Sequence, residues 1–562
     1  MKSSIIFFLL ICVARIITIA QSTNWIWAKN FGSYYVDSPN IVKTDTYGNV
    51  YLAGYFRSPS ISFDSITLTC AANGLSDNTD WFIAKLDSNG NALWARNGNS
   101  LMYAEATSIV IDSEENVYIT GEFRTQTSFD TVILTNVHVS WGDIFIAKYN
   151  ANGGLLWAKR EGGWGYDRAN SIALDKTGNF IYIVGNFDSD TLILASDTLI
   201  NSGGSDVFLA KFDKNGNGLW AKNAGGSNND NALSVAVDTS NNFFITGYDT
   251  SPSISFDSVT FENTGVFLVK YNSDGFVQWA KNFTGLLWDV GNSIAVDMKG
   301  NSYITGYFKS PILYVDNFTL TNNYPGWEDI FFIKTDRDGN VVWAKKAGGD
   351  GFDWGYSVDV DKYGSSYFVG GFGCESLNFD SIIIYNQIHE KTVRDIFIVK
   401  YDENGIALWA FSEGNVNQDF ANSIALNESG NIYITGGFTS PLINFNNITL
   451  HNHYNLISNR LDIFLAKMDQ SEISGTEDIN ISSDISIFPN PFSHSTKISF
   501  KQTYSRIIIE VYNIQGQLVH QSRYTDCAQI LFNKNQLFSG LYVFKIIVDD
   551  KIVETKKVVV CD

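Results

Sequence analysis

The sequence predicts an all-β fold: a seven-bladed β-propeller closed by its N-terminal strand, followed by a small C-terminal β-sandwich. A Trp-Ala dipeptide, usually followed by Lys, recurs seven times, with the first copy at Trp27. The last repeat ends at Lys467, where a further copy would be due. The chain therefore begins with the strand that its last repeat lacks, which indicates a ring closed by its own N-terminus. The seven tryptophans are Trp27, Trp94, Trp157, Trp220, Trp279, Trp343 and Trp409.

The amino-acid composition favours short strands and argues against some classes of binding partner. A chain of 562 residues exceeds one ordinary hydrophobic core, so several domains or a repeat array are expected. Only 17% of residues are charged, whereas 14% are aromatic and 46 are glycine, which fits strands joined by turns better than helices. The net charge of −20 argues against nucleic acid and anionic lipid, because phosphate binding requires a basic surface.

Residues 1–20 have the pattern of a secretory signal peptide. Lys2 precedes an apolar run from Ile5 to Val13, and the segment ends in small residues at Ala20. No other segment approaches ~20 uninterrupted apolar residues, so no transmembrane segment is expected.

Residues 21–469 carry the repeats of the predicted propeller. Each repeat has an apolar run ending in Asp, such as Ser108–Asp112, then a Gly-Asn-x-Tyr run, such as Gly300–Gly306. A third run, such as Asp143–Lys148, leads through a turn into the Trp-Ala-Lys strand. Period-two alternation makes each run a strand, and the Asp-x-x-Gly segments between them are typical of tight hairpins. Four strands in each of seven units predict seven blades.

The predicted blades are large. The tryptophans are 59 to 67 residues apart, above the ~40–50 residues of compact blades. The extra residues lie between the second and third strands, where a Phe-Asp-Ser segment such as Phe63–Ser65 recurs. This repeat resembles the SBBP, or beta-propeller, repeat family over about four fifths of the chain. The resemblance implies a propeller and leaves the function open, because propellers host enzymes, lectins and docking platforms.

The C-terminal part differs from the repeats. Residues 470–483 are polar and unpatterned and are interpreted as a linker. Residues 484–562 contain short strand-like runs that predict a β-sandwich. The segments Phe488–Phe492, Val511–Gly516, Leu537–Tyr542 and Lys556–Val560 resemble the type A sorting domain of the type IX secretion system.

This resemblance implies that residues 484–562 contact the type IX secretion machinery. The protein is then expected to be secreted or held on the outer-membrane surface of a Gram-negative bacterium. Cys527 and Cys561 lie in this domain, and the sequence allows either a disulfide between them or unpaired thiols.

Six of the seven predicted blades have an acidic residue at the same position of the loop that leads into the blade. If these carboxylates lay unpaired around the tunnel mouth, their mutual repulsion would favour a cation such as calcium. The alternative, which we prefer, is that each Asp accepts backbone N–H bonds within its own loop. The remaining blade has Ala104 at this position, followed by Glu105. The six residues are Asp37, Asp167, Asp230, Asp289, Asp353 and Asp419.

Aromatic residues that break the repeat are the candidate ligand-binding residues, because a ligand site rarely has sevenfold symmetry. They lie in the loops between blades or between the second and third strands, and these two loop classes emerge on the same face. Exposed aromatic rings suit sugar or peptide ligands, although packing on neighbouring loops explains them equally well. The candidates are Trp141, Trp164, Tyr166, Trp288, Trp327 and Trp354.

No catalytic motif is present: the sequence has no Gly-x-Ser-x-Gly, His-Glu-x-x-His or phosphate-binding glycine loop. We therefore expect a surface or secreted binding and adhesion module for a glycan or protein ligand, without a cofactor. The alternative is a secreted polysaccharide-degrading enzyme with its site on the same loop face, because catalytic carboxylates need not be close in sequence. A purely structural spacer is a third hypothesis.

Overall fold

The computed structural model describes residues 25–71, 78–388, 390–453, 460–469, 485–504, 506–513, 518–534, 537–548 and 551–561. The described residues form strands and turns and contain no helix. The signal-peptide segment and the expected linker, residues 470–483, lie outside them. The chain divides into two compact units, Met1–Ile473 and Ser474–Asp562, which are described separately.

The first unit consists of four-stranded antiparallel sheets that follow one another along the chain. The first strands of these sheets are β2 (Asp37–Thr44), β8 (Ala104–Ile111), β14 (Asp167–Leu174), β20 (Asp230–Val237), β26 (Asp289–Val296), β32 (Asp353–Val360) and β38 (Asp419–Leu426). The second strands are β3 (Val50–Phe56), β9 (Val117–Phe123), β15 (Phe180–Phe187), β21 (Phe243–Asp249), β27 (Ser302–Phe308), β33 (Ser366–Phe372) and β39 (Ile432–Phe438).

The third and fourth strands complete each sheet. The third strands are β6 (Asp80–Leu86), β12 (Asp143–Tyr149), β18 (Asp206–Asp213), β24 (Gly265–Tyr271), β30 (Asp329–Thr335), β36 (Asp395–Tyr401) and β42 (Asp462–Met468). The fourth strands are β7 (Ala92–Asn97), β13 (Leu155–Glu161), β19 (Gly218–Ala224), β25 (Val277–Thr284), β31 (Val341–Ala347), β37 (Ala407–Glu413) and, from the N-terminus, β1 (Trp25–Phe31).

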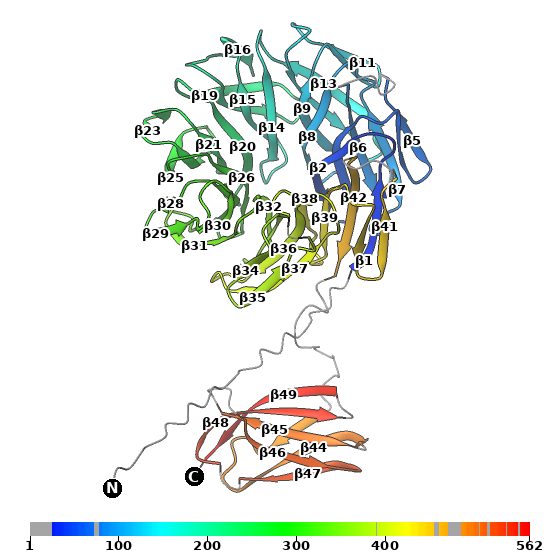
Figure 1. The fold of residues 1–562 in the computed structure, drawn as a ribbon, viewed down its shortest axis with the longest axis vertical. Coiled ribbons are helices and arrows are strands. Elements are labelled where there is room, and N and C mark those ends of the chain that lie inside the picture. The colour runs from blue at the N-terminus through cyan, green and yellow to red at the C-terminus, as the bar shows by residue number, and fades with distance from the viewer. Residues whose placement is uncertain are drawn as a thin grey trace, which may run out of the picture. The chain divides into compact units, whose positions relative to one another are not determined.

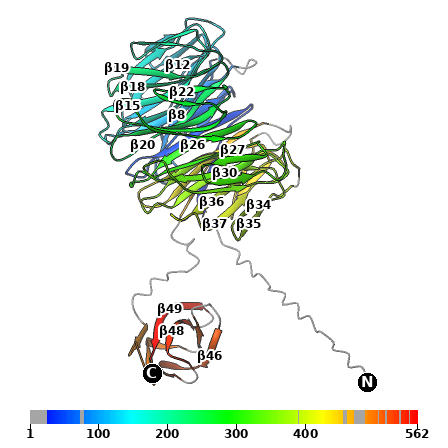
Figure 2. The same cartoon turned by 90° about the vertical axis from the view of Figure 1, so that its left-hand side faces the viewer.

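The sheets have a propeller-like arrangement. The first strands gather around the centre and the fourth strands lie at the rim (Figure 1). Figure 2 shows the sheets from the side, with β15, β18 and β19 of one sheet next to one another. Each first strand contacts the first strand of the next sheet, and β38 contacts β2. Each sheet keeps its own hydrogen-bonded ladder apart from one pairing between β25 and β28. Single backbone hydrogen bonds also join neighbouring sheets at the start of first strands, as from Asp167 N–H to Gly142 O at 2.9 Å.

Each first strand has a β-bulge at the same place, and the bulged residue faces the next sheet. Its side chain donates a hydrogen bond to a backbone carbonyl of that sheet wherever it is Asn or Thr. Leu233 and Tyr356 occupy the two bulges that lack this bond. The five bonds are Asn40 to Ala106 O (2.9 Å), Thr107 to Ala169 O (2.6 Å), Asn170 to Ala232 O (2.9 Å), Asn292 to Gly355 O (2.8 Å) and Asn422 to Pro39 O (2.6 Å).

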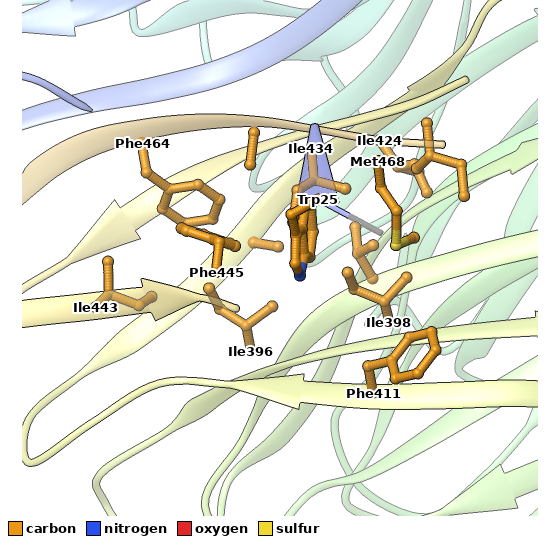
Figure 3. Close-up of a cluster of buried hydrophobic side chains, with 14 of the residues drawn as sticks. Trp25, Ile396, Ile398, Phe411, Ile424, Ile434, Ile443, Phe445, Phe464 and Met468 are labelled. Carbon is orange, nitrogen blue, oxygen red and sulfur yellow. The ribbon is translucent and has the colours of Figure 1, made fainter. Parts of the chain in front are cut away.

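The strand around Trp27 pairs with the last repeat, as the sequence predicted: β1 is antiparallel to β42. Its Trp25 is buried among side chains of the β32 and β38 sheets, including Ile398 and Phe464 (Figure 3). The Trp25 indole N–H also donates to Glu413 Oε1 at 2.8 Å. The N-terminal strand is therefore part of the core that the last two repeats share.

The same strand also contacts the first repeat. The Trp27 indole lies against Gly90 in the turn between β6 and β7, and its N–H donates to Ser88 O at 3.1 Å. A Cβ at Gly90 would lie 3.2 Å from the indole, and the residue has a φ of +81°. Both the close contact and the positive φ therefore favour glycine at this position. Other tryptophans of the motif contact the equivalent glycine of the next sheet in the same way, among them Trp157 at Gly216.

The extra residues between the second and third strands form a short hairpin. In several repeats the Asp at its tip binds the Lys of the Trp-Ala-Lys strand of the preceding sheet, as in Lys29–Asp64 at 3.1 Å and Lys345–Asp380 at 2.5 Å. The length of the repeats thus reflects an added hairpin that connects neighbouring sheets. The hairpins are β4–β5 (Ser60–Phe63, Ile66–Thr69), β10–β11 (Gln126–Phe129, Val132–Thr135), β16–β17 (Thr191–Leu194, Asp197–Ile200), β22–β23 (Ile254–Phe256, Val259–Phe261), β28–β29 (Ile312–Val315, Phe318–Thr321), β34–β35 (Ser376–Phe379, Ile382–Tyr385) and β40–β41 (Leu442–Phe445, Ile448–His451).

The strand order defines two faces of the first unit. The tight turns between first and second strands, and between third and fourth strands, emerge on one face, here called the short-turn face. The loops between sheets and the connections from second to third strands emerge on the other, here called the long-loop face.

The second unit contains a three-stranded sheet, β43-β44-β47, and a four-stranded sheet, β46-β45-β48-β49. Their buried residues, such as Ile498, Phe532, Ile509 and Phe544, form one core, as expected for a small β-sandwich. None of the four cysteines among the described residues forms a disulfide bond. The strands are β43 (Ile485–Phe488), β44 (Ser495–Tyr504), β45 (Ile507–Tyr512), β46 (Leu518–Tyr524), β47 (Cys527–Asn533), β48 (Gly540–Val548) and β49 (Lys551–Val560).

Candidate functional site

The six repeated aspartates lie buried at the start of the first strands, each bonded within its own sheet. Asp419 is representative: it accepts hydrogen bonds from the backbone N–H groups of Asn415, Thr439 and Ser440 and from the Ser440 hydroxyl. The other five, Asp37, Asp167, Asp230, Asp289 and Asp353, make equivalent bonds. These contacts agree with the architectural interpretation of the ring.

The six predicted aromatic residues occupy different surroundings. Trp141 and Trp164 are exposed and lie on either side of His138, with ring centroids 6.4 and 6.1 Å from the imidazole. Trp288 is exposed, and its ring lies 5.8 Å from Tyr248. Tyr166 is half-buried near Glu122.

Trp327 and Trp354 form a second aromatic group and are both half-buried. Phe352 connects them, with ring centroids 4.8 Å from Trp327 and 6.0 Å from Trp354. The structure thus brings together two pairs of the predicted residues, at different junctions between sheets, and leaves Trp288 apart from both.

The residues of the central cavity come mainly from the bulges of the first strands. This open cavity of about 220 Å³ is lined by Asn40, Glu105, Thr107, Arg168, Asn170, Leu233, Asn292 and Tyr356. Glu105, Arg168 and Tyr356 occur once each at their repeat positions, so the lining is asymmetric although the scaffold is repeated. An asymmetric, polar-lined concavity on a rigid scaffold is a typical place for ligand recognition.

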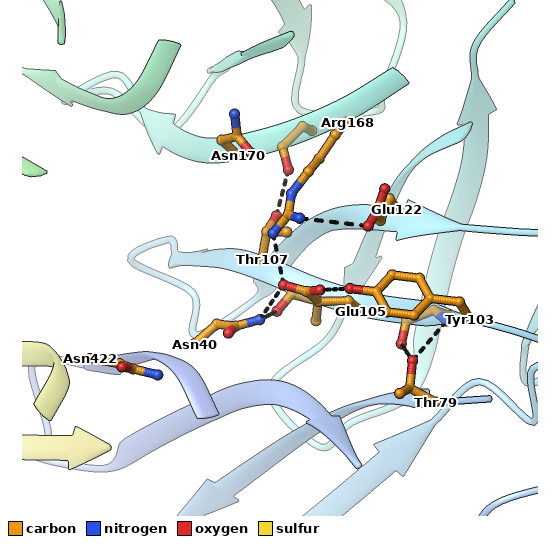
Figure 4. Close-up of polar contacts among 12 residues, drawn as sticks. Asn40, Thr79, Tyr103, Glu105, Thr107, Glu122, Arg168, Asn170 and Asn422 are labelled. Atoms are coloured by element: carbon orange, nitrogen blue, oxygen red, sulfur yellow. Dashed lines mark hydrogen bonds and ion pairs between the residues drawn. The ribbon is translucent and has the colours of Figure 1, made fainter. Parts of the chain in front are cut away.

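One side of the cavity is charged (Figure 4). Arg168 Nη2 lies 2.8 Å from Glu105 Oε1, and Arg168 Nη1 lies 3.6 Å from Glu122 Oε1. Glu105 also accepts hydrogen bonds from Tyr103 and from Asn40. Glu105 and Glu122 are direct partners on β8 and β9, an arrangement of like charges that Arg168 stabilises.

Burial sets the electrostatics of this cluster. It raises the pKa of the Glu122 carboxyl, and the Arg168 charge opposes that shift. Burial also opposes ionisation of Arg168, yet the carboxylates of Glu105 and Glu122 hold its pKa above the usual range. Glu122 Oε2 is buried, and Tyr166 lies beside this carboxyl. Glu105 and Glu122 lie in the sheet whose first strand has Ala104 in place of the repeated Asp, whereas Arg168 lies on β14 of the next sheet.

Aromatic residues lie around Tyr356, which also lines the cavity. Trp354 stacks on Tyr307 with ring centroids 5.3 Å apart, and Tyr356 lies 6.0 Å from Phe420. The buried Arg394 guanidinium lies 4.2 Å from the Trp354 ring centroid, and its Nη1 donates to the Tyr356 hydroxyl at 2.6 Å. One part of the site is thus aromatic and another charged, a combination that can stack on a ring and hydrogen-bond its substituents.

Arg168, Glu122, Tyr307, Tyr356 and Arg394 were not among the site residues that the sequence predicted. A signal was present for Arg168, Glu122, Tyr356 and Arg394, because each breaks the repeat close to a bulge or near the start or end of a strand. Tyr307 had no such signal, because Tyr55 and Tyr248 occupy the same position in other repeats. The prediction relied on tryptophan as a residue type, which does not identify the positions nearest the axis.

A larger cavity lies on the short-turn face. It measures about 920 Å³ and is lined by the turns and strand ends around Asp297, Asp361 and Glu428, together with Lys362 and Lys400. Within the described residues, no group of three or more His, Cys, Asp or Glu side chains could hold a metal ion, here or elsewhere. No helix in the described part of the chain could span a membrane.

Comparison with known families identifies the C-terminal unit. Residues 486–561 match the secretion system C-terminal sorting domain, so the predicted type IX sorting domain is confirmed. The protein is accordingly secreted or attached to the outer surface of a Gram-negative cell.

Two curated proteins are similar to part of this chain. A WD repeat-containing protein of Acanthamoeba polyphaga mimivirus is 26% identical over a match that covers 63% of this chain and 31% of the relative. The regulatory protein FlaEY of Caulobacter vibrioides is 26% identical over 53% of this chain and 31% of its own length. The chain thus spans about a third of the length of these relatives.

Solved structures similar to this chain have low sequence identity. Sqt1 from Chaetomium thermophilum has a TM-score of 0.38 and 10% identity, covering 74% of this chain and 84% of its own. A fungal alcohol oxidase in complex with copper has a TM-score of 0.32 and 11% identity, covering 96% and 100%. At these TM-scores and identities, the similarity gives no information about the activity of this chain.

Proposed function

We propose that this protein is an exported seven-bladed β-propeller, closed by its N-terminal strand, that acts as a binding or adhesion module outside the cell. The pairing of β1 with β42 and the contacts of Trp27 with the first repeat support the closed ring. The resemblance of the repeats to the SBBP family supports a propeller of this kind. The sorting domain supplies the route of export.

The observation that carries the proposal is the asymmetry of the central cavity. The bulges, turns and tryptophans of the scaffold repeat closely. The cavity nevertheless has aromatic residues around Tyr356 on one part and the cluster of Glu105, Glu122 and Arg168 on another. A spacer would have no need of such asymmetry. A ligand with both a ring and polar substituents fits it, and a glycan has both.

The ligand-binding residues proposed on the long-loop face include the predicted set, Trp141, Trp164, Tyr166, Trp288, Trp327 and Trp354. To these we add Arg168 and Tyr356, which line the cavity. No cofactor is proposed. Calcium at the repeated aspartates is the weaker alternative, because those carboxylates already accept hydrogen bonds from their own loops.

A glycan array probed with the purified full chain tests the proposal. Binding should fall at least tenfold in Tyr356→Ala, because the variant removes a cavity wall. The matched control is Tyr363→Ala, an exposed tyrosine on the short-turn face, which should bind as the wild type does. Equal losses from both substitutions, or no binding to any glycan or protein ligand, would contradict a module that binds through the long-loop face.

The second candidate function is a polysaccharide-degrading enzyme. Glu122 favours it, because a buried carboxyl with a raised pKa beside a second carboxylate is the pattern of an acid and its partner. Reducing ends released from polysaccharides by the wild type, and abolished in Glu122→Gln with the fold intact, would support the enzyme. Binding of a glycan without release of reducing ends would exclude the enzymatic function for that glycan.

A further inference from the structure

We propose that the loops between sheets on the long-loop face form a second binding surface, which takes the flat apolar faces of an uncharged, insoluble polysaccharide. This inference rests on the proposed binding function and adds the physical form and charge of the ligand. The surface includes Trp164 and Trp288 of the ligand-binding set proposed above, and none of its residues line the central cavity.

The surface consists of large apolar side chains at the tips of these loops, here called the apolar crown. Five of the seven junctions between sheets contribute at least one, so the crown surrounds the centre of the face. Trp164 is 74% exposed and Leu286 is 85% exposed, far more than packing in a loop requires. The crown is Tyr34, Leu101, Trp164, Leu286, Trp288 and Val416.

The loops of the crown are almost free of charge. Residues 32–36, 98–103, 162–166, 225–229, 285–288, 348–352 and 414–418 contain a single charged residue, Asp350. That residue is paired with Lys391 at 2.8 Å. In a protein of net charge −20, neutral loops of this kind favour an uncharged partner, whereas an acidic polysaccharide would be repelled.

The spacing of the crown favours a polysaccharide over a folded protein. A protein interface has one contiguous apolar centre with a polar rim, whereas the crown residues come from separate loops around an open cavity. A polysaccharide surface presents many copies of one sugar ring, so separate indole, phenol and aliphatic groups can each contact a ring face. Exposed apolar side chains gathered on one face of a secreted protein mark an interaction site.

Co-sedimentation of the purified full chain with microcrystalline cellulose, chitin and insoluble β-1,3-glucan tests the inference. The wild type should bind at least one of them, with the same affinity in low and high salt. The triple variant Trp164→Ser, Leu286→Ser and Trp288→Ser should lower the partition coefficient at least tenfold. The matched control is Tyr47→Ser, Met298→Ser and Tyr363→Ser, three exposed apolar residues of the short-turn face, which should stay within twofold of the wild type.

Several results would overturn the inference. They are absence of binding to every insoluble polysaccharide, equal losses in the two triple variants, and binding that salt abolishes. Crown-dependent dimerisation in light scattering, or crown-dependent binding to phosphatidylcholine vesicles, would assign the surface to a second copy or to lipid instead. If the wild type binds soluble glycans through the cavity but no insoluble polysaccharide, this inference alone is overturned. If the wild type binds neither, the proposed function is overturned as well.

Discussion

Trp27 offers a direct test of how the first and last repeats are joined. Its half-buried indole contacts Gly90 and donates a hydrogen bond to Ser88 O at 3.1 Å, while its strand pairs with β42. Truncation to Ala removes about 100 Å² of buried apolar surface, worth about 2.5 kcal/mol at ~25 cal/mol per Å². The lost hydrogen bond adds about 1 kcal/mol, so the free energy of unfolding should fall by about 3.5 kcal/mol.

The matched variant is Trp157→Ala, at a junction between two repeats that are consecutive in the chain. Trp157 contacts Gly216 and donates to Lys214 O at 3.4 Å, so it loses the same kind of contact. In a closed ring the two junctions are equivalent, and the two variants should be destabilised equally in urea unfolding followed by circular dichroism. In an open array, Trp27→Ala would only loosen a terminal strand. A loss below about 1 kcal/mol for Trp27→Ala, beside a full loss for Trp157→Ala, refutes the closed ring.

Three further predictions concern export, the charged cluster and pH. Deletion of residues 484–562 should leave the repeat unit folded but retained in the periplasm, and normal amounts in the culture medium would refute the role of the sorting domain. Arg168→Ala should cost about 3 kcal/mol by leaving Glu105 and Glu122 without a counter-ion, and adding Glu122→Gln should restore part of it. Burial raises the pKa of Asp395, Asp419 and Glu413 to about 7, so the folded state binds their protons more tightly than the unfolded chain does. Their contribution to stability is complete below their ordinary pKa near 4 and is lost as pH rises through 7, by up to roughly 1.4 kcal/mol per group and pH unit. Calorimetry should therefore give a higher Tm at pH 5 than at pH 8, and a Tm that rises with pH would contradict this assignment.

The strands were predictable because each repeat contains the sequence signals for its own strands and turns. Alternation of apolar and polar residues marks each strand, and the Asp-x-x-Gly segments mark the turns of the short-turn face. The missing last strand and the surplus first one predicted the pairing of β1 with β42. This reasoning needed only periodicity and chain order, which are local properties of the sequence.

The hairpins and the central cavity could not be predicted in the same way. The role of Asp64 depends on Lys29 of another sheet, a contact that is invisible in a single repeat. The cavity depends on which residue of each first strand is bulged, and a bulge shifts the side-chain register by one position. The strand pattern of the sequence therefore does not distinguish Tyr356 from other strand residues, although the bulge directs its side chain into the cavity near the axis.

Tryptophan as a residue type did not by itself distinguish site residues from scaffold residues. The motif tryptophans, such as Trp27, contact glycines of neighbouring turns and serve the scaffold. Trp164 and Trp288 are exposed in the loops, whereas Trp354 stacks on Tyr307 near the cavity. Position relative to the repeat separates these groups, because a scaffold role recurs at every junction and a ligand role does not.

The central claim is that ligand binds on the long-loop face, and hydrogen–deuterium exchange of the full chain with a bound glycan tests it most directly. The account predicts slower exchange in residues 98–103, 162–166 and 285–288 and in the strands that line the central cavity. The turns at residues 45–48, 297–300 and 361–364 should exchange at unchanged rates. Protection confined to residues 297–300 and 361–364, which border the cavity of about 920 Å³ on the short-turn face, would contradict the claim and place the ligand on the opposite side.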